Sequence, residues 1–179
     1  LTKYTKMKKS SKTILKYFLE FFIVAFGVFL GVYVSEWNFQ KKTDANTEKT
    51  LNFIVDEMSV NITKLETSID YQEDLIKSID SLIALLNKDD FEAIFYRNKK
   101  FKFNKLPNYQ GLRFSNLENI MFESAKINGV LQELNISTTQ LIARLYQKQE
   151  GYKSFSTQVN SKFLNINSES KVVDVLSIF

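Results

Sequence analysis

Residues Tyr17 to Val34 form an almost continuous apolar run, interrupted only by the charge of Glu20. A helix of about 18 residues is about 27 Å long, which matches the hydrocarbon core of a bilayer. Inside lipid every backbone polar group needs a partner within the segment, so the segment must be helical. We therefore predict a transmembrane helix over residues 17–37, and the rest of the chain must fold on one side of that membrane or the other.

The charges on the two sides of this run differ. Basic and acidic residues are mixed after it, whereas only lysines precede it. Positively charged residues near a span stay in the cytoplasm, so we expect residues 1–16 to be a basic cytoplasmic tail that contacts anionic lipid. The remaining chain is then expected in the periplasm of a Gram-negative bacterium, anchored in the inner membrane. The tail lysines are Lys3, Lys6, Lys8, Lys9, Lys12 and Lys16.

A cleaved signal peptide has the same charge polarity and is the competing interpretation of the run. The apolar part of a signal peptide is usually about 7 to 15 residues, shorter than this run. Aromatic residues also stand at both ends of it, where amphipathic rings favour the membrane interface. We therefore expect an uncleaved span with Tyr17 as the interface anchor at one end and Tyr33 and Trp37 at the other.

Three residues inside the span are candidates for particular roles. Gly27 and Gly31 form a G-x-x-x-G pair, which allows a second helix to approach closely. Glu20 lies four residues after Lys16, so an i,i+4 ion pair or snorkelling of the side chain explains its presence. The functional alternative for Glu20 is a polar contact with, or a proton site in, a larger membrane complex.

A heptad pattern follows the span over residues 43–88. Apolar residues recur at alternating steps of four and three, and a period of 3.5 residues is that of a coiled coil. One set of positions is β-branched and the other is mostly leucine, which favours dimers, with a shift toward trimers as isoleucine increases. Gln72 is the one polar member and a candidate for fixing the register. The predicted seam is Leu51, Val55, Met58, Ile62, Leu65, Ile69, Gln72, Ile76, Ile79, Ile83 and Leu86.

A second helical segment is expected over residues 115–165. Ser115 with Glu118 and Ser137 with Gln140 are capping-box patterns, and Gly129 lies between them as a helix breaker. From residue 141 to residue 159 apolar residues continue at helical spacing. The seam is therefore expected to pack either within one chain, as a helical hairpin that also oligomerises, or only between chains, as an intermolecular coil.

Residues 89–114 are an aromatic and basic connector between these helices. Asp89 or Asp90 is expected to cap a short helix that ends near Tyr96, and the alternation over residues 99–104 predicts a strand. We interpret the connector as an aromatic cap that closes the hairpin and offers a contact surface to a partner protein. Residues 166–179 are expected to be an arm, either extended or added as a strand to a partner.

The composition excludes much of enzyme chemistry. The chain contains no histidine and no cysteine, which removes imidazole bases, thiol nucleophiles and the metal sites built from them. Carboxylate pairs at 56–57, 73–74 and 89–90 are hard-cation candidates, but the first two lie beside seam positions, where charges normally face water. We expect no catalytic residue, metal or cofactor. Asn61 and Asn135 begin glycosylation patterns, which matter only in a secretory pathway with the right enzymes.

The chain outside the tail carries 18 basic and 20 acidic residues, so the net charge of +4 comes from the tail. This balance argues against a nucleic-acid surface on the main domain.

Several residues give the chain a resemblance to a family of small uncharacterised single-pass bacterial membrane proteins. The resemblance implies a basic tail, one span that ends in Trp-Asn and a helical domain outside the membrane, but it implies no activity. The chain departs from the family at Gly31, where alanine is expected, and in its long connector. The matching residues are Leu19, Glu20, Phe21, Gly27, Trp37 and Asn38, and further along Leu117, Ser124, Leu134 and Tyr146.

Together these features predict an all-α protein with a single transmembrane helix, a long coiled-coil-like helix and a helical hairpin or bundle. We expect a non-enzymatic structural or accessory subunit of a larger envelope complex, in contact with membrane lipid and assembled as a dimer or trimer. The alternative is a sensor-like periplasmic bundle that binds a ligand. Such a sensor needs a partner for its output, because the cytoplasmic tail is short.

Overall fold

The computed structural model describes the backbone of residues 5–179 and the side chains of residues 14–179. Most of the predicted basic tail lies outside the described side chains. The described chain is all-α, as predicted, and forms two compact units, residues 1–49 and residues 50–179. Its elements are α1 (Thr5–Ile83), α2 (Lys88–Glu92), the 3₁₀ helix η1 (Phe103–Lys105), α3 (Ile120–Ile127), α4 (Val130–Glu133), α5 (Ile136–Leu164) and α6 (Val172–Leu176).

In the first unit α1 carries the apolar run. Every side chain from residue 17 to residue 34 is exposed, so the unit provides no protein core for this run. The segment is long and apolar enough to cross a membrane. We expected separate helices with a break between residues 37 and 43, but α1 continues through this region. The region contains neither proline nor glycine, and the Gln40 side chain donates to Asp44 Oδ1 at 3.0 Å across one helical turn.

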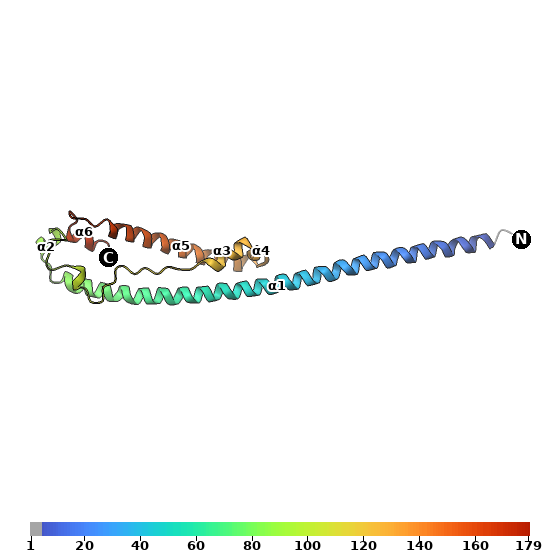
Figure 1. Cartoon of the computed structure of the whole chain (residues 1–179), viewed down its shortest axis with the longest axis horizontal. Helices are drawn as coiled ribbons and strands as arrows, with labels where there is room; N and C mark the ends of the chain where they lie inside the picture. Colours follow the sequence, from blue (N-terminus) through green and yellow to red (C-terminus); the bar gives the residue numbers. More distant parts are fainter. Residues whose placement is uncertain (1–4) are drawn as a thin grey trace. The chain divides into compact units, whose positions relative to one another are not determined.

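In the second unit the chain returns along α1 as an extended segment, residues 112–119, before α5 begins (Figure 1). Residues further along α5 contact residues further along α1. Tyr146 binds Glu57, and Tyr152 binds Ser115 of the returning segment, which in turn binds Lys64. The two long helices are therefore parallel. In a simple helical hairpin, one of the two packings we expected, the helices would be antiparallel; here they are parallel because an extended segment makes the return.

The two capping boxes expected in this region do not start helices. Ser115 is extended, and the following helix α3 begins only at Ile120. α5 begins at Ile136, where Asn135 is the N-cap and its side chain accepts from the Thr138 amide, so Ser137 is not the cap. Gly129 separates α3 and α4 with a φ of 73°, as its position between the helices predicted.

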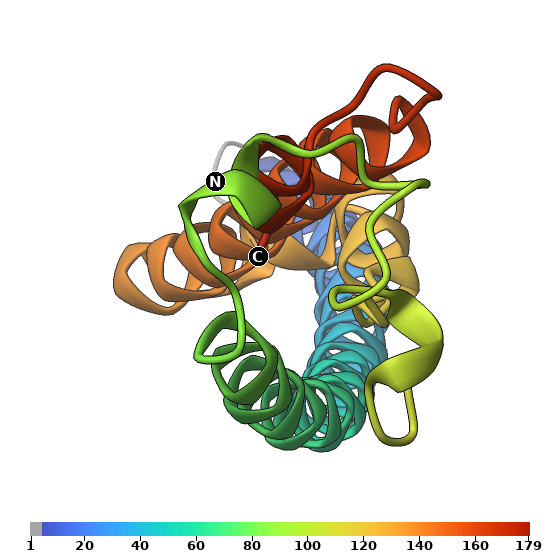
Figure 2. The ribbon, with the colours of Figure 1, turned by 90° about the vertical axis from the view of Figure 1, so that its left-hand side faces the viewer.

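Two apolar cores hold the second unit together, and the connector crosses the unit from the end of α1 before it returns beside this helix (Figure 2). The first, which we name the Phe101 core, joins the end of α1 to the connector and the C-terminal residues. The second, the Tyr146 core, joins the start of this unit to α3, α4 and α5. The buried members of the Phe101 core are Leu75, Ile79, Phe95, Phe101, Leu106, Val172 and Val175, and those of the Tyr146 core are Ile54, Ala125, Val130 and Tyr146.

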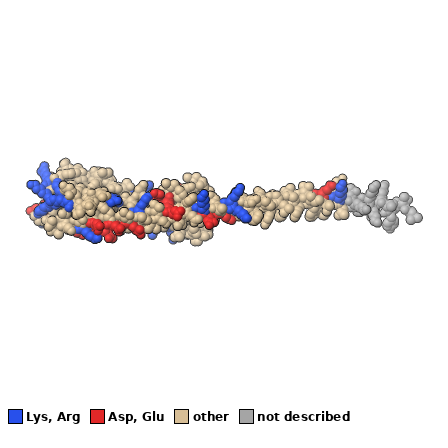
Figure 3. Space-filling view, turned by 60° about the horizontal axis from the view of Figure 1, so that its bottom comes forward, with Lys and Arg blue, Asp and Glu red and all other residues tan. Residues whose placement is uncertain are grey.

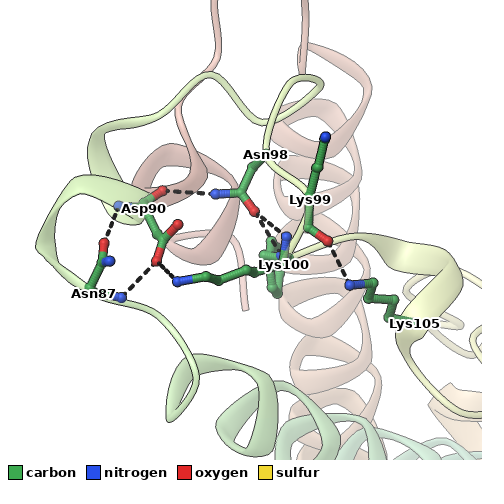
Figure 4. Close-up of polar contacts among 7 residues, drawn as sticks. Asn87, Asp90, Asn98, Lys99, Lys100 and Lys105 are labelled. Atoms are coloured by element: carbon green, nitrogen blue, oxygen red, sulfur yellow. Dashed lines mark hydrogen bonds and ion pairs between the residues drawn. The ribbon is translucent and has the colours of Figure 1, made fainter.

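The connector forms no strand over residues 99–104, contrary to our expectation. Asn98 is buried, and its Oδ1 accepts from the amides of Lys100 at 2.7 Å and Phe101 at 2.8 Å, which bends the chain (Figure 4). A side chain that bonds its own backbone two residues on is the usual cause of such a turn. The bend directs Phe101 into the core, where its ring centroid lies 6.0 Å from that of Phe95.

The short helix of the connector is capped by Asn87 rather than by Asp89 or Asp90, and it ends at Glu92. Asn87 Oδ1 accepts from the Asp90 amide at 3.0 Å, and Asp90 Oδ2 accepts from the Asn87 amide at 2.8 Å. This hydrogen bond and the Lys100 ammonium group, 2.6 Å away, lower the pKa of Asp90 (Figure 4). The sequence does contain a capping box, in which Asn87 is the N-cap and Asp90 is the third helical residue.

The C-terminal residues are not a free arm. The Phe95 amide donates to the Ser170 carbonyl at 2.8 Å, and the Val172 amide donates to the Ala93 carbonyl at 3.0 Å. These bonds dock the start of α6 on the connector. Our expectation of a strand added to a partner is wrong, because the pairing is made within the chain.

We predict that Val175→Ala destabilises the second unit by about 2 kcal/mol, because two buried methyl groups are lost from the Phe101 core. Val173→Ala, two residues away and 41% exposed against 0% for Val175, is the matched control and should change stability by less than about 0.5 kcal/mol. Urea unfolding of the full chain in detergent, followed by the near-ultraviolet circular dichroism of its tyrosines, measures both. Equal effects of the two variants would contradict a docked C-terminus.

Candidate functional site

Between Ile54 and Leu75 the inner face of α1 is polar, and its side chains bind the backbone of the returning segment. Asn61 is only 2% exposed. Its Nδ2 donates to the Glu118 carbonyl at 2.7 Å, and its Oδ1 accepts from the Glu118 amide at 2.8 Å. An extended segment without a neighbouring strand needs other partners for its buried backbone groups, and Asn61 supplies them. The glycosylation pattern at Asn61 is therefore closed to modification in the folded chain.

A second group of α1 side chains binds three consecutive carbonyls of the same segment. Carbonyls alternate in direction along a straight strand, so three that face one helix require turns between them. Gly111 and Arg113 supply these turns with φ angles of 80° and 46°. The left-handed conformation costs a non-glycine residue roughly 1–2 kcal/mol. The bonds run from the Tyr71 hydroxyl to Gly111 at 2.7 Å, from Gln72 Nε2 to Leu112 and from Ser68 Oγ to Arg113 at 2.9 Å.

Glu57 completes this polar face at the other end of the segment. Its carboxylate is 6% exposed and accepts from the Tyr146 hydroxyl at 2.5 Å and from the Met121 amide at 2.9 Å. Asn119, the N-cap of α3, makes no side-chain cap, so Glu57 serves this helix as a cap from a distant part of the sequence. A negative charge is favourable at this end of a helix. The Tyr146 ring stacks on Phe122 with centroids 4.2 Å apart.

The remaining carboxylates have structural surroundings. Asp56 is exposed, and Asp74 is exposed and pairs with Lys77 at 3.1 Å. Among the residues whose side chains the structure describes, no three acidic side chains are placed to hold a metal ion. The polar side chains that are buried together, those of the inner face of α1, bind backbone groups of the same chain, so their arrangement serves the fold.

The structure divides the predicted seam into two sets. Its β-branched positions before residue 79 lie exposed on the surface of the second unit, and we name them the outer stripe. Ile79 is buried, and the other members are half-buried. The Gln72 amide binds the Leu112 carbonyl of its own chain, which accounts for its polar character. The outer stripe is Val55, Ile62, Ile69 and Ile76, with exposed fractions of 61%, 55%, 53% and 47%.

Among its described side chains α1 buries six, and four of them lie one position before the outer stripe and share its seven-residue spacing: Ile54, Asn61, Ser68 and Leu75; the other two are Glu57 and Ile79. The periodicity of apolar residues does not predict this face, because three of its six members are polar. The sequence does contain one sign of this buried face, which is a polar residue that recurs directly before an apolar one. That pattern does not reveal that the polar side chains bind backbone groups.

An apolar groove lies between α1 and α5, with a cavity volume of about 260 Å³. Met58, Ile62 and Leu65 of α1 line one side, and Leu145 and Tyr152 of α5 line the other. Leu117 of the returning segment also lines it, and Ser115 joins that segment to both helices. The Ser115 hydroxyl donates to the Lys64 carbonyl at 2.6 Å, while its amide donates to the Tyr152 hydroxyl at 2.9 Å. We name this feature the α1–α5 groove.

In the first unit the residues singled out for membrane roles lie on the open surface of α1. Nothing else in the described chain comes within 4 Å of a side chain placed at Gly27 or Gly31, so the surface is open there. Trp37 is exposed, with the Lys41 ammonium 4.0 Å from its ring centroid, and Tyr17 and Tyr33 are also exposed. Glu20 pairs with Lys16 at 3.8 Å, as the i,i+4 spacing predicted.

The comparisons with known proteins return nothing: no family model matches the chain, and no curated protein or solved structure is significantly similar to it. The family resemblance therefore stays a prediction.

We predict that Asn61→Ala destabilises the second unit by about 3 kcal/mol, because it leaves both the amide and the carbonyl of Glu118 without partners. Asn52→Ala, at an exposed position on the same helix, has the same helix propensity change and should cost nothing. Urea unfolding of both full-length variants in detergent measures the difference. A difference below about 1 kcal/mol would mean that the segment does not depend on Asn61.

The raised pKa of Tyr146 predicts that the folded chain loses stability at alkaline pH. Its burial, and then its hydrogen bond to Glu57, raise the pKa of the phenol. The folded state therefore keeps the proton that the unfolded state begins to lose near pH 10, and stability falls by up to about 1.4 kcal/mol per pH unit above that point. Burial also raises the pKa of Tyr109 to about 12, which contributes in the same direction.

The matched variant for this prediction is Tyr146→Phe. It should be less stable than the wild type at pH 8, because Glu57 loses a partner. Between pH 9 and pH 11 its melting temperature should fall less steeply than that of the wild type. If the two curves run parallel, Tyr146 does not stay protonated in the folded chain.

Proposed function

We propose that this protein is a non-enzymatic, membrane-anchored structural or accessory subunit of a larger envelope complex, located in a bacterial inner membrane. Its N-terminus would lie in the cytoplasm and its second unit in the periplasm. The lysines before the apolar run and the mixed charges after it support this orientation. The exposed apolar side chains of α1 over residues 17–34 support the anchoring.

The observation that carries the proposal is the outer stripe. Four β-branched side chains at seven-residue spacing remain about half exposed in a unit that already has two apolar cores. A periodic apolar surface of this kind marks a contact with another helix. The buried polar groups support a non-enzymatic role, because Glu57, Asn61 and Ser68 bind backbone groups or a structural tyrosine.

A ligand-binding sensor is the second candidate, and one feature favours it. A hollow of about 590 Å³ lies between α1 and the connector, lined by Tyr71, Gln110 and Arg113 among others, and by Lys77 and Asp74, which pair with each other at 3.1 Å. The Arg113 guanidinium lies 5.2 Å from the Tyr71 ring centroid. A small anionic ligand would suit the Arg113 side of this hollow.

Purification of the tagged full-length chain from its native membrane in a mild detergent, followed by mass spectrometry, tests the proposal. We expect stoichiometric integral membrane partners with the wild type and with Val60→Asp, a control on another face of α1 that is 47% exposed. With Ile69→Asp in the outer stripe we expect at least a tenfold loss of those partners. Recovery of the wild type without any partner would contradict the role of accessory subunit.

A further inference from the structure

The outer stripe and the α1–α5 groove form one continuous apolar surface. Ile62 belongs to the stripe and also lines the groove, where Leu145 of α5 lies on the opposite side. α5 carries a heptad of its own on this side, with Leu141, Leu145 and Tyr152 at steps of four and seven. α1 and α5 are parallel, so the surface presents two parallel helices with the same repeat. Nothing in the described chain covers it, since Ile62 and Leu141 are 55% and 67% exposed.

The two helices of this surface carry opposite charge. Between residues 50 and 83, α1 has seven acidic and two basic residues, while α5 has four basic and one acidic. Figure 3 shows acidic side chains gathered along α1. Glu66 and Glu73 are exposed beside the outer stripe of α1, whereas Arg144 and Lys148 are exposed on α5, and Lys148 lines the groove itself.

We propose that a second copy of the chain covers this surface, with α1 of each copy packed against α5 of the other. This deepens the proposed function and rests on it: a second copy occupies the assembly surface, and recruitment of the other membrane partners would then depend on the dimer. A two-fold axis that runs along the helices produces this arrangement: each α1 faces the partner's α5, and the two acidic α1 helices lie diagonally opposite. The result is a four-helix arrangement of parallel helices, with opposite charges across each contact.

The charges argue against the simpler pairing of α1 with α1. A parallel coil along the outer stripe would place Glu66, Glu73 and Asp80 of one copy opposite Asn61, Ser68 and Leu75 of the other, which carry no positive charge and are buried in their own unit. The α1–α5 contact instead places opposite charges across the interface and uses both heptads. The stripe from Val55 to Ile76 is about 32 Å long, and two helices are about 20 Å wide, so each copy would offer a footprint of roughly 600 Å². This approaches the approximately 800 Å² per partner of a stable interface.

Cross-linking of the purified full-length chain tests the arrangement, and the chain contains no native cysteine to interfere. Val55→Cys and Leu145→Cys place thiols at the same level of the unit, since Tyr146 bonds to Glu57. Two differently tagged single-cysteine chains are mixed in detergent and treated with a short bismaleimide. We expect at least fivefold more product between the two different chains than between two Val55→Cys chains. A predominance of the Val55–Val55 product, or no product at all, would overturn the proposal.

The salt dependence of dimerisation gives an independent measurement. Opposite charges across the contact predict that the dimer Kd from sedimentation equilibrium rises at least fivefold between 50 mM and 500 mM NaCl. Lys148→Glu should raise the Kd by at least tenfold at low salt, while Lys153→Glu, on a residue that lines a different hollow of α5, should leave it unchanged. A wild type that is monomeric, or a Kd that falls with salt, would overturn the α1–α5 contact. Both measurements use the isolated chain. Failure of the dimer can therefore be distinguished from failure of the proposed function, which the co-purification of other membrane proteins tests separately.

Discussion

The second unit depends on hydrogen bonds between side chains of one helix and the backbone of a segment that has no neighbouring strand. Asn61 binds both backbone groups of Glu118, and Ser68, Tyr71 and Gln72 bind three carbonyls in succession. Buried backbone groups without partners are costly, so this segment lies between α1 and α5 only because α1 offers these side chains. The parallel course of α5 follows, since the segment has already returned the chain to the start of the unit.

This arrangement determines which surface remains for assembly. Between Ile54 and Leu75, α1 directs polar residues inward, and its apolar β-branched residues are left on the side of the helix next to the groove. In an ordinary amphipathic helix the apolar stripe faces the core. Here a backbone segment occupies that side and selects polar residues. The apolar repeat is then available to another helix, which we propose belongs to a second copy because α1 is acidic and α5 is basic.

The sequence predicted the parts of the fold that depend on periodicity and failed where side chains bind distant backbone. The apolar run, the helical continuation and the break at Gly129 followed from composition and spacing. The extended return did not, because residues 115–118 match a capping box, and nothing local shows that Asn61 and Lys64 bind this segment instead. The heptad repeat lies in a continuous helix, but which of its residues face the core depends on Glu57, Asn61 and Ser68, whose burial no local rule predicts.

Amide hydrogen exchange of the full-length chain in detergent micelles, followed by NMR, tests the central role of these bonds most directly. The amides of Ser115, Glu118 and Met121 donate to Tyr152, Asn61 and Glu57. We expect the exchange rates of these three amides to lie within about tenfold of the rates in the interior of α5, although two of the amides lie outside any helix or strand. Exchange at the rate of an unstructured chain would show that α1 does not hold the segment, and the orientation of the outer stripe would lose its explanation.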